Sequence, residues 1–169
     1  MRVAVIARST LELRSACAIA LSRLISDGHE VHAIIPNKGT SYMGLSKAHT
    51  LSTFGIDASN IHFVDGFDYC AITQSNADKI NAWIKKLGPK LVFIPHWKST
   101  NPDELILGRT SLIACRGIGN ILMYEPQDNN NFVPSVLFPK SANRTDLNSD
   151  ESESYESHRI LLLDEVEMI

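Results

Sequence analysis

The sequence predicts an α/β protein, a three-layer sandwich whose mainly parallel sheet carries helices on both faces. Short apolar runs rich in β-branched residues alternate along the chain with longer segments whose apolar residues recur at helical spacing. Glycine or proline separates many of these segments. Alternation of this kind is typical of a parallel sheet, because each crossover helix returns the chain to the same edge. At 169 residues the chain is long enough for one domain with its own core.

Three strands and two helices are predicted in the first part of the chain. Residues 2–7 are an apolar run rich in β-branched side chains and form the first strand. Residues 12–26 place apolar side chains at helical spacing, and Gly28 follows as a stop signal. The next predicted elements are a strand over 31–36, a loop over 36–44, a helix over 45–54 closed by Gly55, and a short strand over 61–64.

The second part of the chain continues the alternation. After a loop over 66–73, residues 75–87 predict a helix with Ser75 or Asn76 as its N-cap. The remaining predicted elements are a buried strand over 91–95, a helix over 102–116, a strand over 120–124 and an edge strand over 133–138. Pro134 stands near the start of that last strand, where a missing backbone N–H is tolerated.

The loops after the first and fourth strands are predicted to meet. Right-handed crossovers place the segments that follow residues 2–7 and 91–95 at the same edge of the sheet, its carboxyl edge. If the strand order reverses between these two strands, their loops flank the topological switch point. That point is the usual ligand crevice of an open α/β sheet.

The chain divides into an α/β domain over residues 1–140 and an acidic, Ser-rich tail over 141–169. The tail holds two Arg against eight Asp or Glu, whereas the domain is mildly basic. Its polar composition predicts a flexible segment. The apolar end of the tail, ILLLDEVEMI, offers a segment that docks on a partner protein or on a second copy of this chain.

Composition argues against several classes of protein. No apolar run approaches the ~20 residues of a membrane span, so no membrane contact is expected. The amino terminus lacks the apolar core and cleavage site of a signal peptide, which predicts a cytoplasmic protein. No strongly basic patch with interleaved aromatics is present, so a nucleic-acid partner is not expected.

Two helix starts at the predicted carboxyl edge carry capping signals. Ser9 and Glu12 form a capping box, in which the hydroxyl accepts from the amide of Glu12 and the carboxylate reaches back to the amide of Ser9. Asn101 is a predicted N-cap, followed by Pro102 at the first helical position. Asp103 lies in the first turn, where the helix dipole favours an acid. Capping alone therefore explains why these acids stand here.

Three separated blocks carry a resemblance to a known family. ARSTLE at residues 7–12 is followed by DGHEVHAIIP, PHWKSTNPDE stands at 95–104, and NILMYEPQDNNNFVPSVLF spans 120–138. In order and spacing these blocks resemble the N-acetylglucosaminyl de-N-acetylases, the PIG-L/LmbE-like family. The family's first block has the form A-H-P-D-D-E and its second the form P-H-P-x-D-x-H-x-D-H. The resemblance covers residues 2–138 and implies a Rossmann-like fold.

The family's zinc-binding residues are not retained in this chain. The resemblance places Arg8, Leu11 and Glu104 at the three positions where the family has its zinc ligands. Thr10 stands at the position of the family's general base, and Asn101 at that of a histidine that stabilises the developing charge. A catalytic zinc needs about three protein ligands and an open position for water. We therefore expect a degenerate member of the family, with no zinc or other cofactor and no zinc-dependent deacetylation.

Glu12, His96 and Asp103 are the positions that still match the family's motif letters. They are the candidate catalytic residues of an alternative, an active de-N-acetylase-like hydrolase of N-acetylated amino sugars with a rebuilt site around His96, Asp103 and Glu104. His96 is the one candidate whose ordinary pKa lies near neutrality. His96 and Glu104 are weak candidates for metal ligands, because sites rich in carboxylate with a single histidine rarely hold zinc tightly.

Arg8 is expected to replace the charge of the metal. A guanidinium at the end of the first strand points into the crevice, so we expect it to pair with Asp103 and Glu104. Trp97 and Lys98 place an aromatic ring beside a cation, an arrangement that can stack on a sugar and meet a phosphate. The remaining histidines form no spaced cluster and receive no predicted role: His29, His32, His49, His62 and His158.

The function favoured by these observations is a non-catalytic sugar-binding or accessory protein of carbohydrate metabolism. The resemblance suggests an amino sugar or nucleotide sugar as its ligand. The polar residues expected to bind this ligand are Arg8, His96, Lys98 and Asn131. The alternatives are the hydrolase described above and an interaction subunit that docks through residues 141–169.

Overall fold

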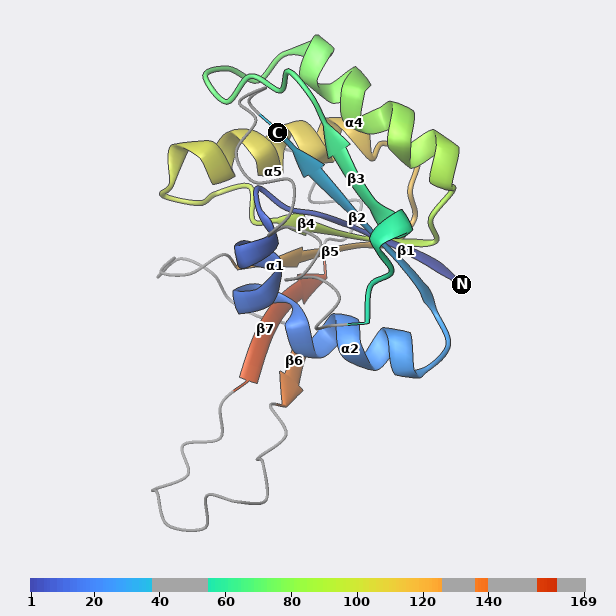
Figure 1. The fold of residues 1–169 in the computed structure, drawn as a ribbon. Helices are drawn as coiled ribbons and strands as arrows, with labels where there is room; N and C mark the ends of the chain where they lie inside the picture. The colour runs from blue at the N-terminus through green and yellow to red at the C-terminus, as the bar shows by residue number, and fades with distance from the viewer. Residues whose placement is uncertain (38–54, 126–135, 140–154, 161–169) are drawn as a thin grey trace.

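A computed structural model describes residues 1–37, 55–125, 136–139 and 155–160. Their strands form one sheet in the order β3-β2-β1-β4-β5-β7-β6 (Figure 1). The strands are β1 (Arg2–Ile6), β2 (Glu30–Pro36), β3 (Ile61–Val64), β4 (Leu91–Pro95), β5 (Ile121–Tyr124), β6 (Val136–Pro139) and β7 (Tyr155–Ile160). The first five are parallel, and β7 is antiparallel to both β5 and β6. The predicted α/β class with a mainly parallel sheet is confirmed.

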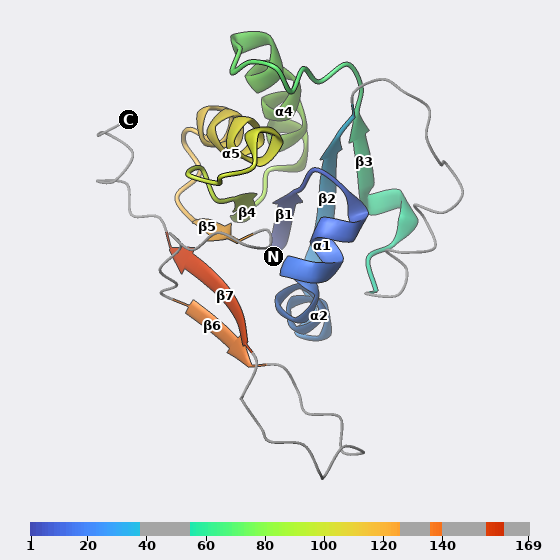
Figure 2. The same cartoon turned by 90° about the vertical axis from the view of Figure 1, so that its left-hand side faces the viewer.

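Helices cover both faces of the sheet, which makes three layers (Figure 2). The helices are α1 (Thr10–Ala16), α2 (Ala18–Ser26), α4 (Gln74–Leu87) and α5 (Pro102–Ala114), with a short 3-10 turn at Ala58–Asn60. Val3 and Val5 of β1 pack in the layer under α1 and α2, whereas Ala4 and Ile6 pack in the layer under α4 and α5. Alternate residues of one buried strand therefore contribute to both cores, as expected for a sheet covered on both sides.

Two of the predicted helices differ in detail. The helix expected over 12–26 is broken at Cys17, whose φ of −130° ends α1 and precedes α2. Both pieces pack their buried residues in the same layer, so the helical spacing in the sequence runs through the break. The N-cap of α4 is Thr73 and not Ser75 or Asn76, because the Thr73 hydroxyl accepts from the amide of Asn76 at 3.1 Å. The helix predicted over 45–54 lies outside the described residues.

The carboxyl-terminal part of the sheet was not expected. Residues 155–160, assigned from composition to a flexible tail that begins at 141, form β7 between β5 and β6. Backbone pairing with two other strands satisfies this polar segment, and composition alone carries no sign of such partners. The strand predicted over 133–138 is described from Val136 onward as β6. The other tail residues lie outside the described part of the chain.

The predicted switch point is present. β1 and β4 are neighbours, with β2 and β3 on the far side of β1 and β5 on the far side of β4. The chain therefore leaves β1 and β4 in opposite directions along the sheet, and Arg8 and His96 follow these two strands directly. This geometry makes the carboxyl edge between them the expected crevice for a ligand.

Gly108 lets α5 approach the segment that follows β4. A Cβ atom built at this position would lie 2.8 Å from the carbonyl oxygen of Pro95 and 3.0 Å from Cα of Trp97. Both are backbone atoms and cannot rotate away. We expect Gly108→Ala to lower the free energy of unfolding by about 1–3 kcal/mol, the usual cost of overpacking, as measured by urea denaturation. The matched control is Gly119→Ala, where no atom lies within 4 Å of the added methyl. Equal stability of the two variants would contradict the close packing.

Two histidines come together on β2 and β3, the two strands at one side of the sheet. His32 of β2 and His62 of β3 lie with Nδ1 and Nε2 3.2 Å apart, and Nε2 of His32 is 3.1 Å from the Glu30 carboxylate. His62 stacks on Trp83 with ring centroids 4.2 Å apart. The sequence did not suggest this pair of histidines, because pairing of β2 with β3 joins residues 30 positions apart.

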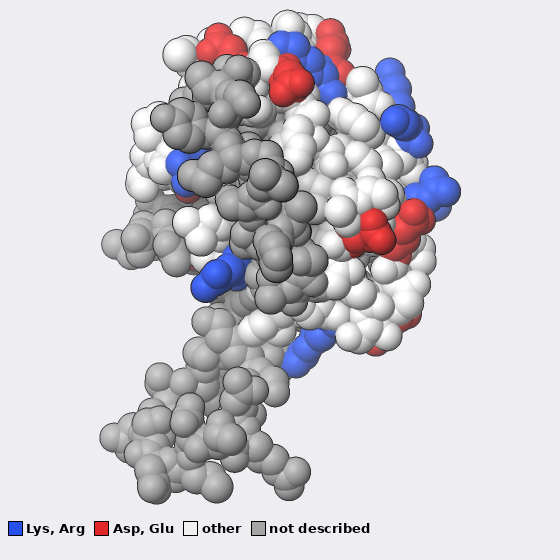
Figure 3. Space-filling view, viewed as in Figure 1, with Lys and Arg blue, Asp and Glu red and all other residues white. Residues whose placement is uncertain are grey.

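The described surface shows no segregation of charge on the face in Figure 3, where acidic and basic side chains are interspersed. Within the same residues, no helix has the length and apolar character needed to cross a bilayer.

Candidate functional site

Arg8 lies between two carboxylates at the carboxyl edge of the sheet. Its Nε is 3.5 Å from Oε2 of Glu12, and its Nη2 is 3.5 Å from Oε1 of Glu104. The two acid side chains are only 4% and 7% exposed, whereas 38% of the Arg8 side chain is exposed. The pairing with Glu104 was expected from the sequence, and Glu12 is a second partner that the sequence did not suggest.

Glu12 is positioned by the first turn of α1. The Ser9 hydroxyl accepts from the amide of Glu12 at 3.2 Å, which is one half of the predicted capping box. The other half differs, because Oε2 of Glu12 accepts from the backbone amide of Arg8 at 3.3 Å instead of that of Ser9. The carboxylate is therefore turned toward the sheet, where its other oxygen meets Tyr124 of β5.

Tyr124 connects Glu12 to the backbone of β1. Its buried hydroxyl lies 2.6 Å from Oε1 of Glu12 and 2.9 Å from the carbonyl oxygen of Ile6. A hydroxyl has one hydrogen, and both neighbours are acceptors when Glu12 is ionised. Both contacts become hydrogen bonds if Glu12 carries a proton, donates it to Tyr124, and Tyr124 donates to Ile6. Burial raises the pKa of Glu12, whereas the Tyr124 hydrogen bond and the Arg8 charge lower it.

Glu104 is positioned by the first turn of α5. The Asn101 side chain accepts from the amides of Asp103 and Glu104, which confirms its predicted role as N-cap. The Ser99 hydroxyl donates to Oε2 of Glu104 at 2.8 Å and accepts from the amide of Asn101 at 3.1 Å. Burial raises the pKa of Glu104, whereas the Ser99 hydrogen bond and the Arg8 charge act in the opposite direction. Helix capping and site geometry therefore depend on the same few residues.

The two carboxylates are held in the same way. Each has one oxygen hydrogen-bonded to a hydroxyl, of Tyr124 or of Ser99, and each presents the other oxygen to Arg8. The 3.5 Å separations from Arg8 exceed the 2.7–3.2 Å usual for N–H···O hydrogen bonds. The guanidinium is thus held by charge, while the acids are held by hydrogen bonds.

His96, Trp97 and Lys98 connect β4 to Ser99, the residue whose hydroxyl bonds Glu104. His96 is buried, and its backbone amide donates to the carbonyl oxygen of Tyr124 at 2.9 Å. The exposed Lys98 places its Nζ 4.4 Å from the centroid of the Trp97 ring. Arg109 of α5 donates from Nε to the carbonyl oxygen of Trp97 at 3.3 Å. Lys98 is therefore accessible to a ligand, whereas His96 is buried.

Of the other residues predicted for the site, Asp103 is half-buried in the first turn of α5, and Asn131 lies outside the described residues. Tyr69, in the loop before α4, was missed. It is buried, its hydroxyl donates to the carbonyl oxygen of Pro36 at 3.2 Å, and burial together with the charges of Glu12 and Asp103 raises its pKa. No local sequence pattern signals Tyr69. It follows β3, and only the fold brings its loop close to Glu12 and Asp103.

The chain is similar to known proteins in its fold. No family model and no curated protein sequence matches the chain. A solved structure of a conserved protein from Thermus thermophilus is similar, with a TM-score of 0.66 and 18% identity over 80% of this chain and 70% of that one. The N,N′-diacetylchitobiose deacetylase from Pyrococcus horikoshii has a TM-score of 0.60 and 14% identity, over 73% of this chain and 60% of the deacetylase. The fold is that of the PIG-L/LmbE-type deacetylases.

This deacetylase fold does not by itself specify the reaction. The 4-carboxy-2-hydroxymuconate hydratase GalB from Pseudomonas putida is also similar, with a TM-score of 0.62 and 11% identity over 81% of this chain and 71% of the hydratase. A hydratase and deacetylases thus share one architecture. At such identities the similarity establishes the fold, and the function must be argued from the site.

The residues at the site do not fit the zinc ion of PIG-L/LmbE-type deacetylases. The sequence resemblance places Arg8, Leu11 and Glu104 at the three ligand positions. The Arg8 guanidinium has no lone pair to offer, and its positive charge would repel a metal cation. Leu11, at the second position, is 66% exposed and has no ligating atom. The Glu104 carboxylate, at the third, is engaged by Ser99 and Arg8. Among the described residues, no group of three or more His, Cys, Asp or Glu is arranged to hold a metal.

Proposed function

We propose that this chain is a deacetylase-fold protein that has lost zinc-dependent hydrolysis and binds a carbohydrate at the carboxyl edge of its sheet. The observation that carries the proposal is the Arg8 guanidinium, 3.5 Å from both Glu12 and Glu104 beside the switch point. A fixed organic cation supplies charge at this edge, but it cannot lower the pKa of a bound water as a metal does. Without an activated water there is no nucleophile to attack an amide.

Two observations support a carbohydrate as the ligand: the names of structurally similar proteins, and the pair formed by Trp97 and Lys98. The similar enzyme from Pyrococcus horikoshii is, by its name, a deacetylase of an N-acetylated amino sugar. Trp97 and Lys98 offer an aromatic surface beside a cation in this chain. Amino sugars and nucleotide sugars are therefore the first ligands to test. A docking role for residues 141–169 is a separate prediction.

The absence of zinc-dependent chemistry is tested by metal content. The full chain is purified without chelator, incubated with zinc, desalted, and its bound metal is determined by mass spectrometry. We expect less than about 0.1 zinc per chain, because the donor set is too poor for a catalytic site. The deacetylase from Pyrococcus horikoshii, treated in parallel, is the positive control. About one zinc per chain, lost in His96→Ala or in Glu104→Gln, would establish the rebuilt hydrolase site instead.

Sugar binding is tested by saturation-transfer NMR with N-acetylglucosamine and a nucleotide sugar. Signals transferred to the sugar ring protons are expected from the native chain, and they should weaken in Trp97→Ala, which removes the aromatic surface. Trp83→Ala is the matched control, because Trp83 stacks on His62 at the opposite edge. If no sugar of either kind receives transfer, the carbohydrate-binding proposal is wrong.

A further inference from the structure

We propose that Arg8 binds an oxyanion, so that the sugar ligand of this site carries a carboxylate or a phosphate group. The inference rests on the carbohydrate-binding function proposed above and specifies its ligand further. It follows from the donors that Arg8 retains, from the way the guanidinium is held, and from the charge of its neighbours.

Arg8 retains donors that a ligand can use. A guanidinium has five N–H donors. Among the residues that the structure describes, the Arg8 side chain makes two ion pairs at 3.5 Å and donates no hydrogen bond of ordinary length. Since 38% of this side chain is exposed, its donors are accessible to a ligand that arrives from solvent. Carboxylates and phosphates are the groups whose paired oxygens match the guanidinium fork.

The guanidinium is held in place from the protein side. Glu12 attracts Nε and Glu104 attracts Nη2, and each acid is itself fixed by a buried hydroxyl, of Tyr124 or of Ser99. Arg8 is therefore oriented before any ligand arrives, which reduces the entropy that binding must overcome. The acids are almost fully buried and Arg8 is partly exposed, so a ligand that arrives from solvent meets N–H groups before it meets carboxylates.

The charge of the cluster permits an anion to bind. With both acids ionised, the cluster of Arg8, Glu12 and Glu104 would carry a net negative charge and would repel an anion. Burial of the Glu12 carboxyl, whose side chain is only 4% exposed, raises its pKa and favours its protonated form. The cluster is then neutral, and the exposed Lys98 is a further cation. A protonated amine would instead face the guanidinium directly and be repelled.

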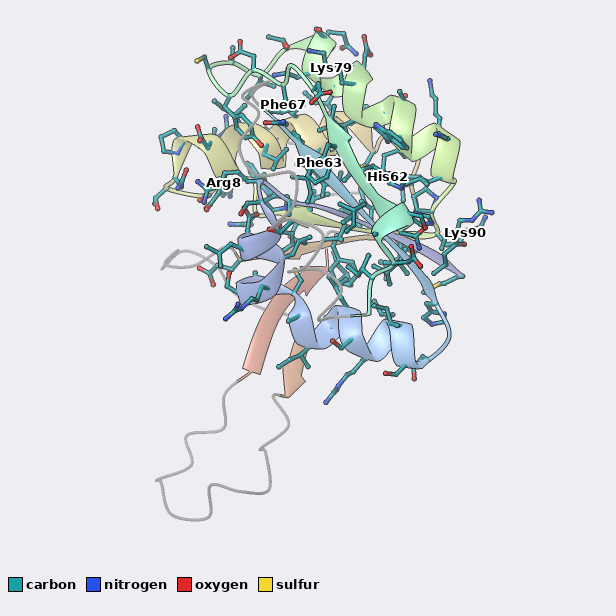
Figure 4. All side chains as sticks on the ribbon, viewed as in Figure 1. Arg8, His62, Phe63, Phe67, Lys79 and Lys90 are labelled. Atoms are coloured by element: carbon teal, nitrogen blue, oxygen red, sulfur yellow. The ribbon has the colours of Figure 1, made fainter. Side chains whose placement is uncertain are left out.

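Affinity for matched sugars tests the inference. The native chain is titrated calorimetrically with N-acetylglucosamine, N-acetylglucosamine 6-phosphate, N-acetylmuramic acid and inorganic phosphate. The two acidic sugars should bind at least about tenfold more tightly than the neutral one, and the one that binds better distinguishes phosphate from carboxylate. Arg8→Gln should remove this preference, whereas Lys90→Gln, which removes a charge at the opposite edge, should retain it (Figure 4).

The outcomes separate this inference from the proposed function. Equal affinities of the native chain for neutral and acidic sugars, or an acid preference that survives in Arg8→Gln, would overturn the role of Arg8 and leave sugar binding intact. Binding of inorganic phosphate without any sugar would support the oxyanion site and reject the sugar function. If Arg8→Gln does not fold, the native chain can be tested directly by NMR. The ¹⁵Nε–H signal of Arg8 should shift when N-acetylmuramic acid or inorganic phosphate is added. A signal unmoved by both would overturn the inference.

Discussion

Replacing Arg8 with methionine is expected to destabilise the protein, and to do so more at pH 8 than at pH 5. The substitution keeps a long side chain but leaves the buried carboxylates of Glu12 and Glu104 facing each other without a cation. Removing one partner of a fully buried ion pair costs about 3–5 kcal/mol. Because more than a third of Arg8 is exposed to screening solvent, we expect a loss on the order of 2 kcal/mol.

The pH dependence follows from the two carboxyl groups. Burial raises the pKa of both acids above the ordinary value of 4.5, so the folded chain holds these protons more tightly than the unfolded chain. Their contribution to stability is therefore complete below pH 4.5 and is lost as the pH rises through the raised values. The Arg8 charge lowers both pKa values, so its removal raises them further and enlarges the loss at pH 8.

Thermal unfolding followed by circular dichroism between pH 5 and pH 8 measures the effect of Arg8→Met. Lys90→Met is the control for removing one positive charge, since Lys90 is exposed at the far edge of the sheet. A difference in Tm between the native chain and Arg8→Met that is the same at pH 5 and pH 8 would show that Glu12 and Glu104 do not depend on the guanidinium.

Replacing Tyr124 with phenylalanine is expected to cost about 2–4 kcal/mol of folding free energy. The substitution conserves the ring but removes the hydroxyl between Glu12 and the carbonyl oxygen of Ile6. Two buried polar groups then lose a partner, at about 1–3 kcal/mol each. The loss should be larger at pH 8, because the Tyr124 hydrogen bond lowers the pKa of Glu12 and its removal lets that pKa rise further.

Urea denaturation of Tyr124→Phe and of Tyr69→Phe measures this cost. Tyr69 is the matched control, since its buried hydroxyl donates to the carbonyl oxygen of Pro36, and its loss should cost about 1 kcal/mol. Combining Tyr124→Phe with Glu12→Gln should give less than the sum of the two single losses, because the two side chains contact each other. Additive losses would argue against the shared hydrogen at this contact.

The elements that the sequence predicted best are those whose signals are local. The N-cap role of Asn101 involves amides two and three residues away, and the Ser9 hydroxyl bonds an amide three residues away. A side chain so close along the chain has few alternatives, so its residue type nearly determines its contact. The same holds for the alternation of apolar runs and helical segments, from which the mainly parallel sheet followed.

The contacts that the sequence did not predict join residues that are distant along the chain. From the sequence, helix capping was enough to explain Glu12. In the structure its carboxylate contacts Tyr124, 112 residues away, and does not bond the amide of Ser9 as the capping box predicted. Residues 155–160 are polar and joined the sheet only because β5 and β6 supply backbone partners on both sides. His32 and His62 required strand pairing to meet. Each of these contacts depends on how strands are ordered in the sheet, which periodicity does not encode.

The sequence by itself determined the fold class and the helix caps at the carboxyl edge. It did so because residue type limits local hydrogen bonding regardless of context. Only the tertiary structure decided that Arg8 lies between Glu12 and Glu104, each anchored by a buried hydroxyl. That arrangement needs the ends of β1, β4 and β5 and the first turns of α1 and α5 side by side, and packing alone brings them together.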